Sequence, residues 1–349
     1  MLNLRLLNLT ILEANLKYLL TLLLVVTLVT LTFLDFKKET DKPLTVQGSI
    51  MGTTYKVVTY GDNNSISKEE IHDIFSGVNK EMSTYLNDSL ISKINKSALS
   101  EWVGVSENFI KVLNFASSLC FDTNGAYDVS IGRLVNLHGF GPTTKDNSYK
   151  QNDKEVLDQV GCDSIETEGL SVRRLRDVHL DFSSIAKGYA IDLVHEALVS
   201  NKDINAHYIE LGGEIRTSYI KLNNRPWIVG IESPENPNKP FITLNSNIVD
   251  SFALATSGDY RNIKIDNDSV ITHTLITKTG KPKKFSKSSV TVLSDTAMKS
   301  DALATALNAM EPEQAILYSN KNNINAIFFS HLDEETEVIF SYSMAEIVK

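Results

Sequence analysis

The stretch Asp181-Phe-Ser-Ser-Ile-Ala-Lys-Gly-Tyr-Ala190 decides how the chain folds around its chemistry. The apolar pattern before it predicts a strand that ends in His179-Leu180-Asp181, and two serines then lead into a helix that begins near Ser183. Free amides at a helix N-terminus, with Lys187 on the first turn, suit an anionic ligand. A capped helix with an exposed lysine gives the same pattern, so this segment alone leaves both explanations open.

Outward from this segment, helix and strand patterns alternate without an internal repeat. Ser67 and Glu70 form a capping box that starts one helix, and further helices are predicted over 106–121, from 183 and over 296–310. The strand predictions are Ser49–Tyr60, His207–Leu211, Trp227–Ile231, Ala253–Thr256, Ser289–Leu293, Asn325–Ser330 and Glu337–Tyr342, with a turn at Gly61–Asn64. We expect a mixed α/β (α+β) fold, with one compact catalytic unit of one or two lobes over residues 48–345.

The composition is that of an ordinary globular protein. The 349 residues are 42 % hydrophobic and 22 % charged, with 17 glycines, 8 prolines and 2 cysteines, which excludes a disordered tail, a collagen and a disulfide scaffold. The net charge of −9 argues against a protein that binds nucleic acid through its phosphates. Cys120 lies in an apolar helix pattern typical of a buried residue, and its spacing from Cys162 matches no metal site. The redox state of the two cysteines stays open.

The first 47 residues differ from the rest of the chain. After a tail over residues 1–17, residues 18–34 (YLLTLLLVVTLVTLTFL) carry no charge, Gly or Pro, and as a helix they span roughly 25 Å. They predict a membrane anchor or signal helix, followed by a polar linker over residues 35–47. No A-x-A-like cleavage site follows, which favours an uncleaved anchor over a removed signal peptide. Basic residues flank the span evenly and leave its orientation undecided.

Asp301 and Thr305 lie four residues apart, so the predicted helix places them on one face. A hard cation such as Mg²⁺ prefers oxygen ligands, often one carboxylate together with hydroxyls, carbonyls and waters. An aspartate near a helix N-terminus also complements the helix dipole without any ligand. The pair alone leaves both explanations open.

Three further polar segments contain glycine turns. Gly125–Asp128 together with Asn136–Pro142 places an aromatic residue beside such turns, where it could stack on a planar ring. Ala255–Arg261 ends a strand in a polar turn, and His273–Gly280 carries a histidine before a Thr-Gly turn. Ordinary loops and a structural histidine explain these segments equally well.

Taken together and in this order, the segments resemble the ApbE family of FAD:protein FMN transferases, bacterial flavin-trafficking enzymes that face the periplasm or the cell exterior. The resemblance covers about residues 48–315. The matching pieces are Met51–Tyr55, Met82–Tyr85 with Asp88-Ser89, Gly125–Asp128, Leu134–Leu137 with Gly139–Pro142, Asp181–Ala190, Leu211–Ile215, Ala255–Asn262, His273–Gly280 and Thr296–Leu307.

The resemblance implies Mg²⁺-dependent cleavage of FAD and transfer of its FMN moiety to a Thr or Ser hydroxyl of a target protein, with release of AMP. Such a reaction depends on positioning and charge neutralisation. The implied metal ligands are the side chains of Asp301 and Thr305 and the backbone carbonyl of Ser184. His273 is the implied general base and, with Asp301, makes up the implied catalytic pair. The residues implied around FAD are Met51, Tyr85, Ala126, Tyr127, Asp128, Asp181, Lys187 and Leu275.

The chain departs from the family pattern at four positions. Ile276 and Thr277 stand where an Asp and a Pro are common, Arg133 stands where a Pro is common, and His138 stands where a Trp is usual. These changes spare the implied metal ligands and the implied lysine. The lipidated N-terminal cysteine common in the family is missing, so the apolar span is the expected anchor.

The resemblance also implies a place and a partner. It places the chain in the bacterial inner (cytoplasmic) membrane, with the catalytic unit facing the periplasm or the cell exterior, and it implies a flavin-accepting subunit of a membrane electron-transfer complex as target. Two alternatives remain. An FAD pyrophosphatase of the same fold would use water in place of the protein hydroxyl and give FMN and AMP. A non-catalytic extracytoplasmic flavin-binding module would hold FAD unchanged.

Overall fold

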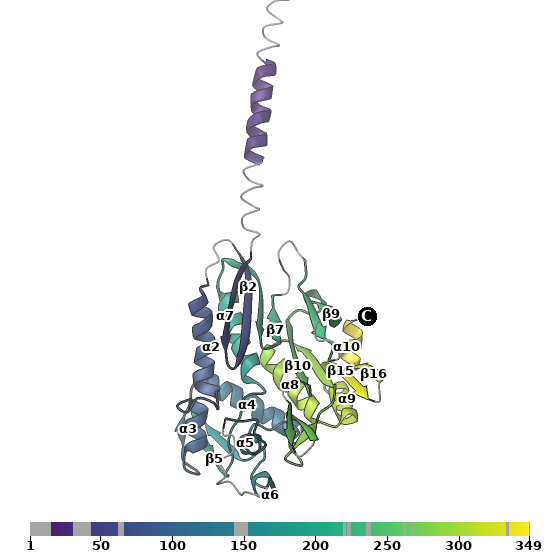
Figure 1. Cartoon of the computed structure of the whole chain (residues 1–349). Helices are drawn as coiled ribbons and strands as arrows, with labels where there is room; N and C mark the ends of the chain where they lie inside the picture. Colours follow the sequence, from purple (N-terminus) through teal and green to yellow (C-terminus); the bar gives the residue numbers. More distant parts are fainter. Residues whose placement is uncertain are drawn as a thin grey trace, which may run out of the picture.

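The computed structural model of the chain describes residues 15–30, 43–61, 66–142, 153–218, 221, 225–234, 239–260, 263–266, 269–332 and 335–348. Residues 15–30 form a helix (Figure 1). The side chains of this helix are exposed. Within the described ranges, no helix is both long and apolar enough to cross a membrane. Residues 1–14 and 31–42, which include the end of the predicted anchor and most of the predicted linker, lie outside the described residues.

An eight-stranded antiparallel sheet forms the centre of the body, in the order β1-β2-β6-β7-β10-β14-β15-β16 (Figure 1). Its strands are β1 (Leu44–Ile50), β2 (Thr53–Gly61), β6 (Ile204–Leu211), β7 (Glu214–Thr217), β10 (Phe252–Gly258), β14 (Ser289–Ser294), β15 (Asn325–Leu332) and β16 (Glu335–Phe340). Successive side chains of a strand point to opposite faces. On β10, Ala253 and Ala255 therefore join one core cluster, and Phe252 and Leu254 join another. Since both faces are buried there, the strand reads as a continuous apolar run.

Three small sheets surround the large one. They are β3 (Val103–Gly104), β5 (Ser171–Arg174) and β4 (Ile165–Glu168); the hairpin of β8 (Ile228–Glu232) and β9 (Pro240–Asn245); and β11 (Ile263–Asp266), β12 (Ser269–Ile276) and β13 (Lys281–Lys284). The β8–β9 hairpin contributes Val229, Ile231 and Leu244 to the smaller of the two core clusters. It therefore helps to cover one face of the large sheet.

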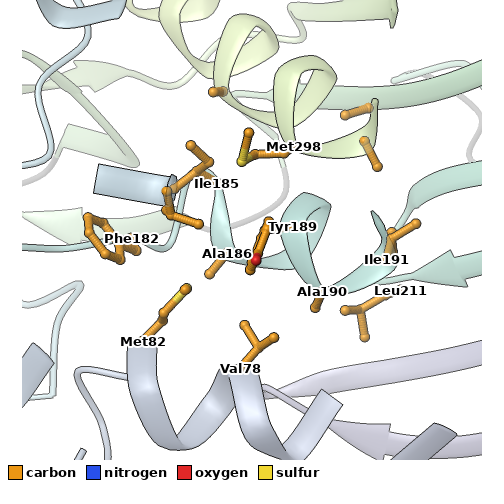
Figure 2. Close-up of a cluster of buried hydrophobic side chains, with 14 of the residues drawn as sticks. Val78, Met82, Phe182, Ile185, Ala186, Tyr189, Ala190, Ile191, Leu211 and Met298 are labelled. Atoms are coloured by element: carbon orange, nitrogen blue, oxygen red, sulfur yellow. The ribbon is translucent and has the colours of Figure 1, made fainter. Parts of the chain in front are cut away.

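Three helices pack on the other face: α2 (Lys68–Met82), α7 (Ala186–Ser200) and α8 (Ala297–Ala309). The remaining helices of the body are α3 (Leu90–Lys96), α4 (Glu107–Asp122), α5 (Gly132–Leu137), α6 (Asp153–Leu157) and α9 (Pro312–Lys321), while α10 (Tyr342–Ile347) packs on β15 and β16. Figure 2 shows the start of α7 between α2 and α8. Phe182, Ile185 and Tyr189 are fully buried there, so the segment that carries Lys187 is held by packing on several sides.

Most predicted elements are confirmed because their signals are local. The capping box of Ser67 and Glu70 is present in both directions. The predicted helix over 106–121 is α4, and the one over 296–310 is α8. The six strand predictions from residue 207 onward correspond to β6, β8, β10, β14, β15 and β16. The mixed α/β class is confirmed with them.

Three predictions near the site were wrong. Ser49–Tyr60 is not one strand, because a turn at Met51-Gly52 divides it into the β1–β2 hairpin, with Ile50 opposite Thr53. Both turn residues have positive φ, 52° and 75°, as a tight two-residue hairpin turn requires. No described strand ends at Asp181, because His179 forms only an isolated bridge with Ile131. The helix α7 begins at Ala186 rather than near Ser183. The turn predicted at Gly61–Asn64 lies largely outside the described residues.

The two cysteines form a disulfide bond. Cys120 near the end of α4 is joined to Cys162, with the two Cα atoms 5.6 Å apart and 42 positions apart in the sequence. The bond closes the segment that contains Gly125–Asp128. Cys120 is thus buried, as its apolar surroundings predict, but as half of a disulfide rather than as a free thiol.

Candidate functional site

The site is built where α7 and α8 begin side by side. The Gly188 N–H donates a hydrogen bond to Asp301 Oδ2 at 3.1 Å. A Cβ atom at position 188 would lie 2.3 Å from the Ala297 carbonyl oxygen, a distance that no side chain tolerates. Glycine at position 188 therefore allows the two helices to approach closely enough for Asp301 to reach the first turn of α7.

Asp192 fixes the start of α8. Its carboxylate accepts hydrogen bonds from Ala297 N–H at 2.8 Å and Met298 N–H at 2.9 Å, and it pairs with Arg216 Nη1 at 2.5 Å. These bonds satisfy amides that the helix itself leaves unpaired. Burial raises the pKa of Asp192, while Arg216 and the two amides oppose the rise. Asp301 lies one turn further along α8, so Asp192 orients the helix that carries it.

Lys187 lies between two buried carboxylates. Its Nζ is 3.3 Å from Glu214 Oε1 and 3.8 Å from Asp301 Oδ2. Burial raises the pKa of both carboxyl groups, and the Lys187 charge opposes the rise in each case. Lys187, Glu214 and Asp301 are referred to below as the acid–lysine group. The structure thus brings together two residues that the sequence resemblance implied and adds Glu214.

With both carboxyl groups ionised, the acid–lysine group carries more negative than positive charge. Two carboxylates face one ammonium, and Glu214 Oε2 is buried without a hydrogen-bond partner among the described residues. A buried charge without compensation is costly, so this donor set fits a bound cation. Thr305 lies one turn after Asp301 on the same face of α8. Carboxylate and hydroxyl oxygens are donors that a hard divalent cation accepts.

Glu214 was missed as a site residue by the sequence analysis. It lies in the matched segment Leu211–Ile215, at the start of β7, but a lone glutamate after two glycines carries no local signal of burial. The Gly212 N–H donates to the Thr54 carbonyl at 3.1 Å, which brings the start of β2 beside the Gly212-Gly213 turn that precedes Glu214. Only the packing of distant strands shows this arrangement.

The loop Gly125–Asp128 lies next to the segment before α7. The Asp181 N–H donates to the Val129 carbonyl at 2.8 Å, and Ser184 Oγ lies 3.0 Å from the Tyr127 hydroxyl. Tyr127 is buried, which raises its pKa far above the usual range, so the phenol stays neutral. The loop and the start of α7 therefore form one continuous wall next to the acid–lysine group.

The carboxylates of this wall hold its backbone. Asp128 accepts a hydrogen bond from Ser130 N–H, and Asp181 accepts one from Ser183 N–H, each at 2.8 Å. Burial raises the pKa of Asp128, against those hydrogen bonds. Each carboxylate has lone pairs left for hydroxyl or N–H groups of a ligand. Ala126 lies in the same loop, two positions before Asp128.

Tyr85 offers an aromatic face at the edge of this wall. The residue is 66 % exposed, and its hydroxyl donates to the Phe140 carbonyl at 3.0 Å. Phe140 belongs to the predicted glycine-rich segment Asn136–Pro142. An exposed ring fixed by its hydroxyl is suited to stack on a planar ligand.

His273 and Leu275 lie on β12, in the small sheet beside α8. Asn308 near the end of α8 donates to Thr274 Oγ1 at 3.2 Å and to Asp259 Oδ1 at 2.9 Å, which ties the His273 strand to the helix that carries Asp301. Leu275 is buried with Leu134 and Val156. The resemblance implies that Leu275 lines FAD, whereas in the structure its side chain already packs in a hydrophobic cluster.

The central sheet is covered on both faces, which defines an α/β protein. Its acid–lysine group lies at the start of a helix, where the site suits an anionic ligand together with a cation. Comparison with known proteins identifies the family. The ApbE family model matches residues 51–328, so the chain belongs to the ApbE family.

Relatives and solved structures agree with this assignment. An FAD:protein FMN transferase of Haemophilus influenzae is 36 % identical over 310 residues, which cover 82 % of this chain and 86 % of that protein. The Vibrio cholerae relative of the same name is 32 % identical over 300 residues, covering 83 % and 88 %. The structure of a flavin transferase ApbE from Vibrio cholerae superposes with a TM-score of 0.75 at 30 % identity, covering 87 % of this chain and 99 % of that one. The apo flavinyl transferase ApbE of Pseudomonas stutzeri gives 0.77 at 26 %, covering 88 % and 97 %.

Proposed function

We propose that this member of the ApbE family is an FAD:protein FMN transferase that uses Mg²⁺ and attaches FMN to a Thr or Ser hydroxyl of a target protein. The observation that carries the proposal is the buried acid–lysine group at the start of α7 and α8. A pyrophosphate with its cation is the kind of ligand that one lysine and two carboxylates can hold together. The curated relatives of that name support the activity.

Asp301, Thr305 and the backbone carbonyl of Ser184 are the residues proposed to hold the cation. When bound, Mg²⁺ would supply positive charge to the pyrophosphate of FAD. Lys187 supplies a further positive charge from the first turn of α7, at the positive end of the helix dipole. Tyr85, Ala126, Tyr127, Asp128, Asp181 and Met51 are proposed to surround FAD, and Leu275 supports that wall from the cluster behind it.

His273 is proposed as the general base. It would take the proton of the target hydroxyl while the hydroxyl oxygen forms a bond to the FMN phosphorus. The bond from that phosphorus to the bridging oxygen breaks, and AMP leaves with the electron pair. Histidine is the side chain that most often transfers protons in catalysis at neutral pH.

The proposed test uses the full chain in detergent with FAD, Mg²⁺ and a flavin-accepting domain of a sodium-linked electron-transfer complex. Intact mass and in-gel flavin fluorescence should show a covalent FMN adduct on the acceptor. Asp301→Ala removes a proposed ligand of the cation, and His273→Ala removes the proposed general base. Each should reduce the rate at least about 100-fold, which for His273 is within the usual range for a general base. Asp73→Ala and His72→Ala, both on α2 and away from the site, are the matched controls and should transfer FMN normally.

The two alternatives predict different products. A pyrophosphatase would give free FMN and AMP without an adduct. A flavin-binding module would hold FAD unchanged, both in the wild-type protein and in Asp301→Ala. Either result would contradict the transferase proposal.

We also propose that the body acts outside the cytoplasm, tethered by the apolar N-terminal segment to the inner membrane. The disulfide of Cys120 and Cys162 supports this location, because such bonds persist in oxidising compartments. The exposed leucines and valines of residues 15–30 support the tether. Labelling of intact cells with an impermeant lysine reagent should modify the body, and an unlabelled body would contradict the orientation.

A further inference from the structure

The β11–β12–β13 sheet is held to the rest of the body on two sides. On one side Asn308 of α8 reaches Thr274. On the other side Leu275 packs with Leu134 of α5 and with Val156. The sheet pairs with no strand of the central sheet in the described chain. Side chains rather than a β-ladder therefore set where His273 lies relative to the wall formed by Gly125–Asp128.

Two hydrogen bonds cross this joint from the turn that follows β12. The Thr277 hydroxyl donates to the Gly125 carbonyl, and Thr277 is buried. His138, directly after α5, donates from Nε2 to the Gly280 carbonyl at 2.8 Å, since a carbonyl only accepts. These two contacts, Thr277–Gly125 and His138–Gly280, are referred to as the clasp.

The clasp joins the two halves that the reaction must align. Thr277 follows His273 by four residues on the same stretch of chain, and Gly125 directly precedes Ala126 and Tyr127. Gly125 has φ of +76°, so its carbonyl points where few other residues would direct it. A bond to that carbonyl therefore fixes the loop and the strand to each other.

We propose that Thr277 and His138 are positioning residues, which set the His273 strand at its working distance from the flavin-binding loop. The inference rests on the proposed transferase function, because it needs a base on one side of the joint and FMN on the other. Neither residue touches the reacting atoms in this scheme. Misalignment of reacting groups by about 1 Å can cost a large factor in rate, whereas binding of FAD depends mainly on the loop itself.

The experiment compares Thr277→Val with Thr277→Ser and His138→Phe in the full chain, with Thr279→Val as the matched control. Thr279 lies in the same turn, but its hydroxyl bonds within the turn, to the Ile276 carbonyl. We expect kcat for FMN transfer to fall about tenfold in Thr277→Val and in His138→Phe, the loss of roughly one hydrogen bond. The Kd for FAD from flavin fluorescence should stay within twofold. Thr277→Ser should restore the rate, because it restores the hydroxyl.

A second measurement does not depend on activity. Hydrogen–deuterium exchange of the peptide over residues 123–138 should be faster in Thr277→Val and unchanged in Thr279→Val. Unchanged exchange in Thr277→Val would overturn the clasp, and so would a rate loss that Thr277→Ser does not rescue. If the wild-type protein makes no FMN adduct, the proposed function is contradicted. If Thr277→Val still shows faster exchange in that case, the structural role of the clasp is nevertheless supported.

Discussion

Glu214 shares the charge of a single lysine with Asp301, and one of its oxygens is buried without a hydrogen-bond partner among the described residues. This makes Glu214 the residue whose charge is least compensated in the site. A bound cation would relieve that imbalance, even where Glu214 itself is not one of its ligands. Its part in the site is therefore electrostatic.

Glu214→Gln keeps the size of the side chain and removes one negative charge. We expect the affinity for Mn²⁺, used as a paramagnetic substitute for Mg²⁺, to fall about tenfold, because a nearby charge in a buried site contributes on the order of 1–2 kcal/mol. Titration followed by electron paramagnetic resonance checks this. Glu196→Gln, on the exposed side of α7, is the control and should bind Mn²⁺ as the wild type does. Equal affinity in both variants would show that Glu214 does not act on the cation.

At the scale of elements, α7 and β6 are joined by a pair of histidines, of which His207 is buried and His195 is partly buried. His207 Nε2 lies 2.8 Å from His195 Nδ1, close to Arg216. Burial lowers the pKa of His195 to about 4 and of His207 to about 3. Both rings are therefore neutral in the folded protein at neutral pH.

This pair predicts loss of stability in acid. The unfolded chain binds protons near pH 6.5, whereas the folded pair binds them only near pH 4 and below, so the unfolded state gains protons first as the pH falls. The free energy of unfolding should decrease from about pH 6.5 down to about pH 4. Urea unfolding between pH 7 and 4 measures it. His195→Gln/His207→Gln should show a slope smaller by up to about two protons, and an identical slope would refute the assignment.

The elements that could be predicted were those with local signals. Ser67 with Glu70 marks a helix start within four residues, and the apolar runs of the central sheet are strands because both faces are covered. The β1–β2 hairpin was missed because Met51 is not a residue expected at positive φ. The strand predicted before Asp181 was wrong because its apolar residues pack as an irregular segment. An apolar run in the sequence does not distinguish a β-strand from a buried irregular segment.

For the site, motif order predicted Lys187 and Asp301, and the structure places them in contact. Glu214 could not be predicted as a partner, because it reaches Lys187 through the packing of β7 against α7. The pairing of Cys120 with Cys162 was equally hidden, since two cysteines 42 positions apart carry no sign of proximity. Residues that meet only through tertiary packing are the ones that a single sequence leaves out.

At the scale of the whole molecule, the disulfide is the covalent link that closes a loop through the site. A cross-link restricts the unfolded chain, and loops of this size contribute roughly 2–4 kcal/mol. We expect reduction with dithiothreitol to lower the free energy of unfolding in urea by about that amount. Cys120→Ser/Cys162→Ser should match the reduced protein and should not respond to dithiothreitol. A wild type that is insensitive to reduction would argue that the bond contributes nothing.

The central sheet pairs segments that are made at very different times. Tyr55 of β2 lies opposite Leu211 of β6, which follows it by 156 positions. At about 5–20 residues per second, a ribosome needs roughly 8–30 s to add that much chain. Throughout this interval β2 lacks its inner neighbour, and an unpaired strand edge is a template for wrong association. The inner edge of β2 therefore stays open to wrong association for a period set by translation speed rather than by the stability of the finished fold.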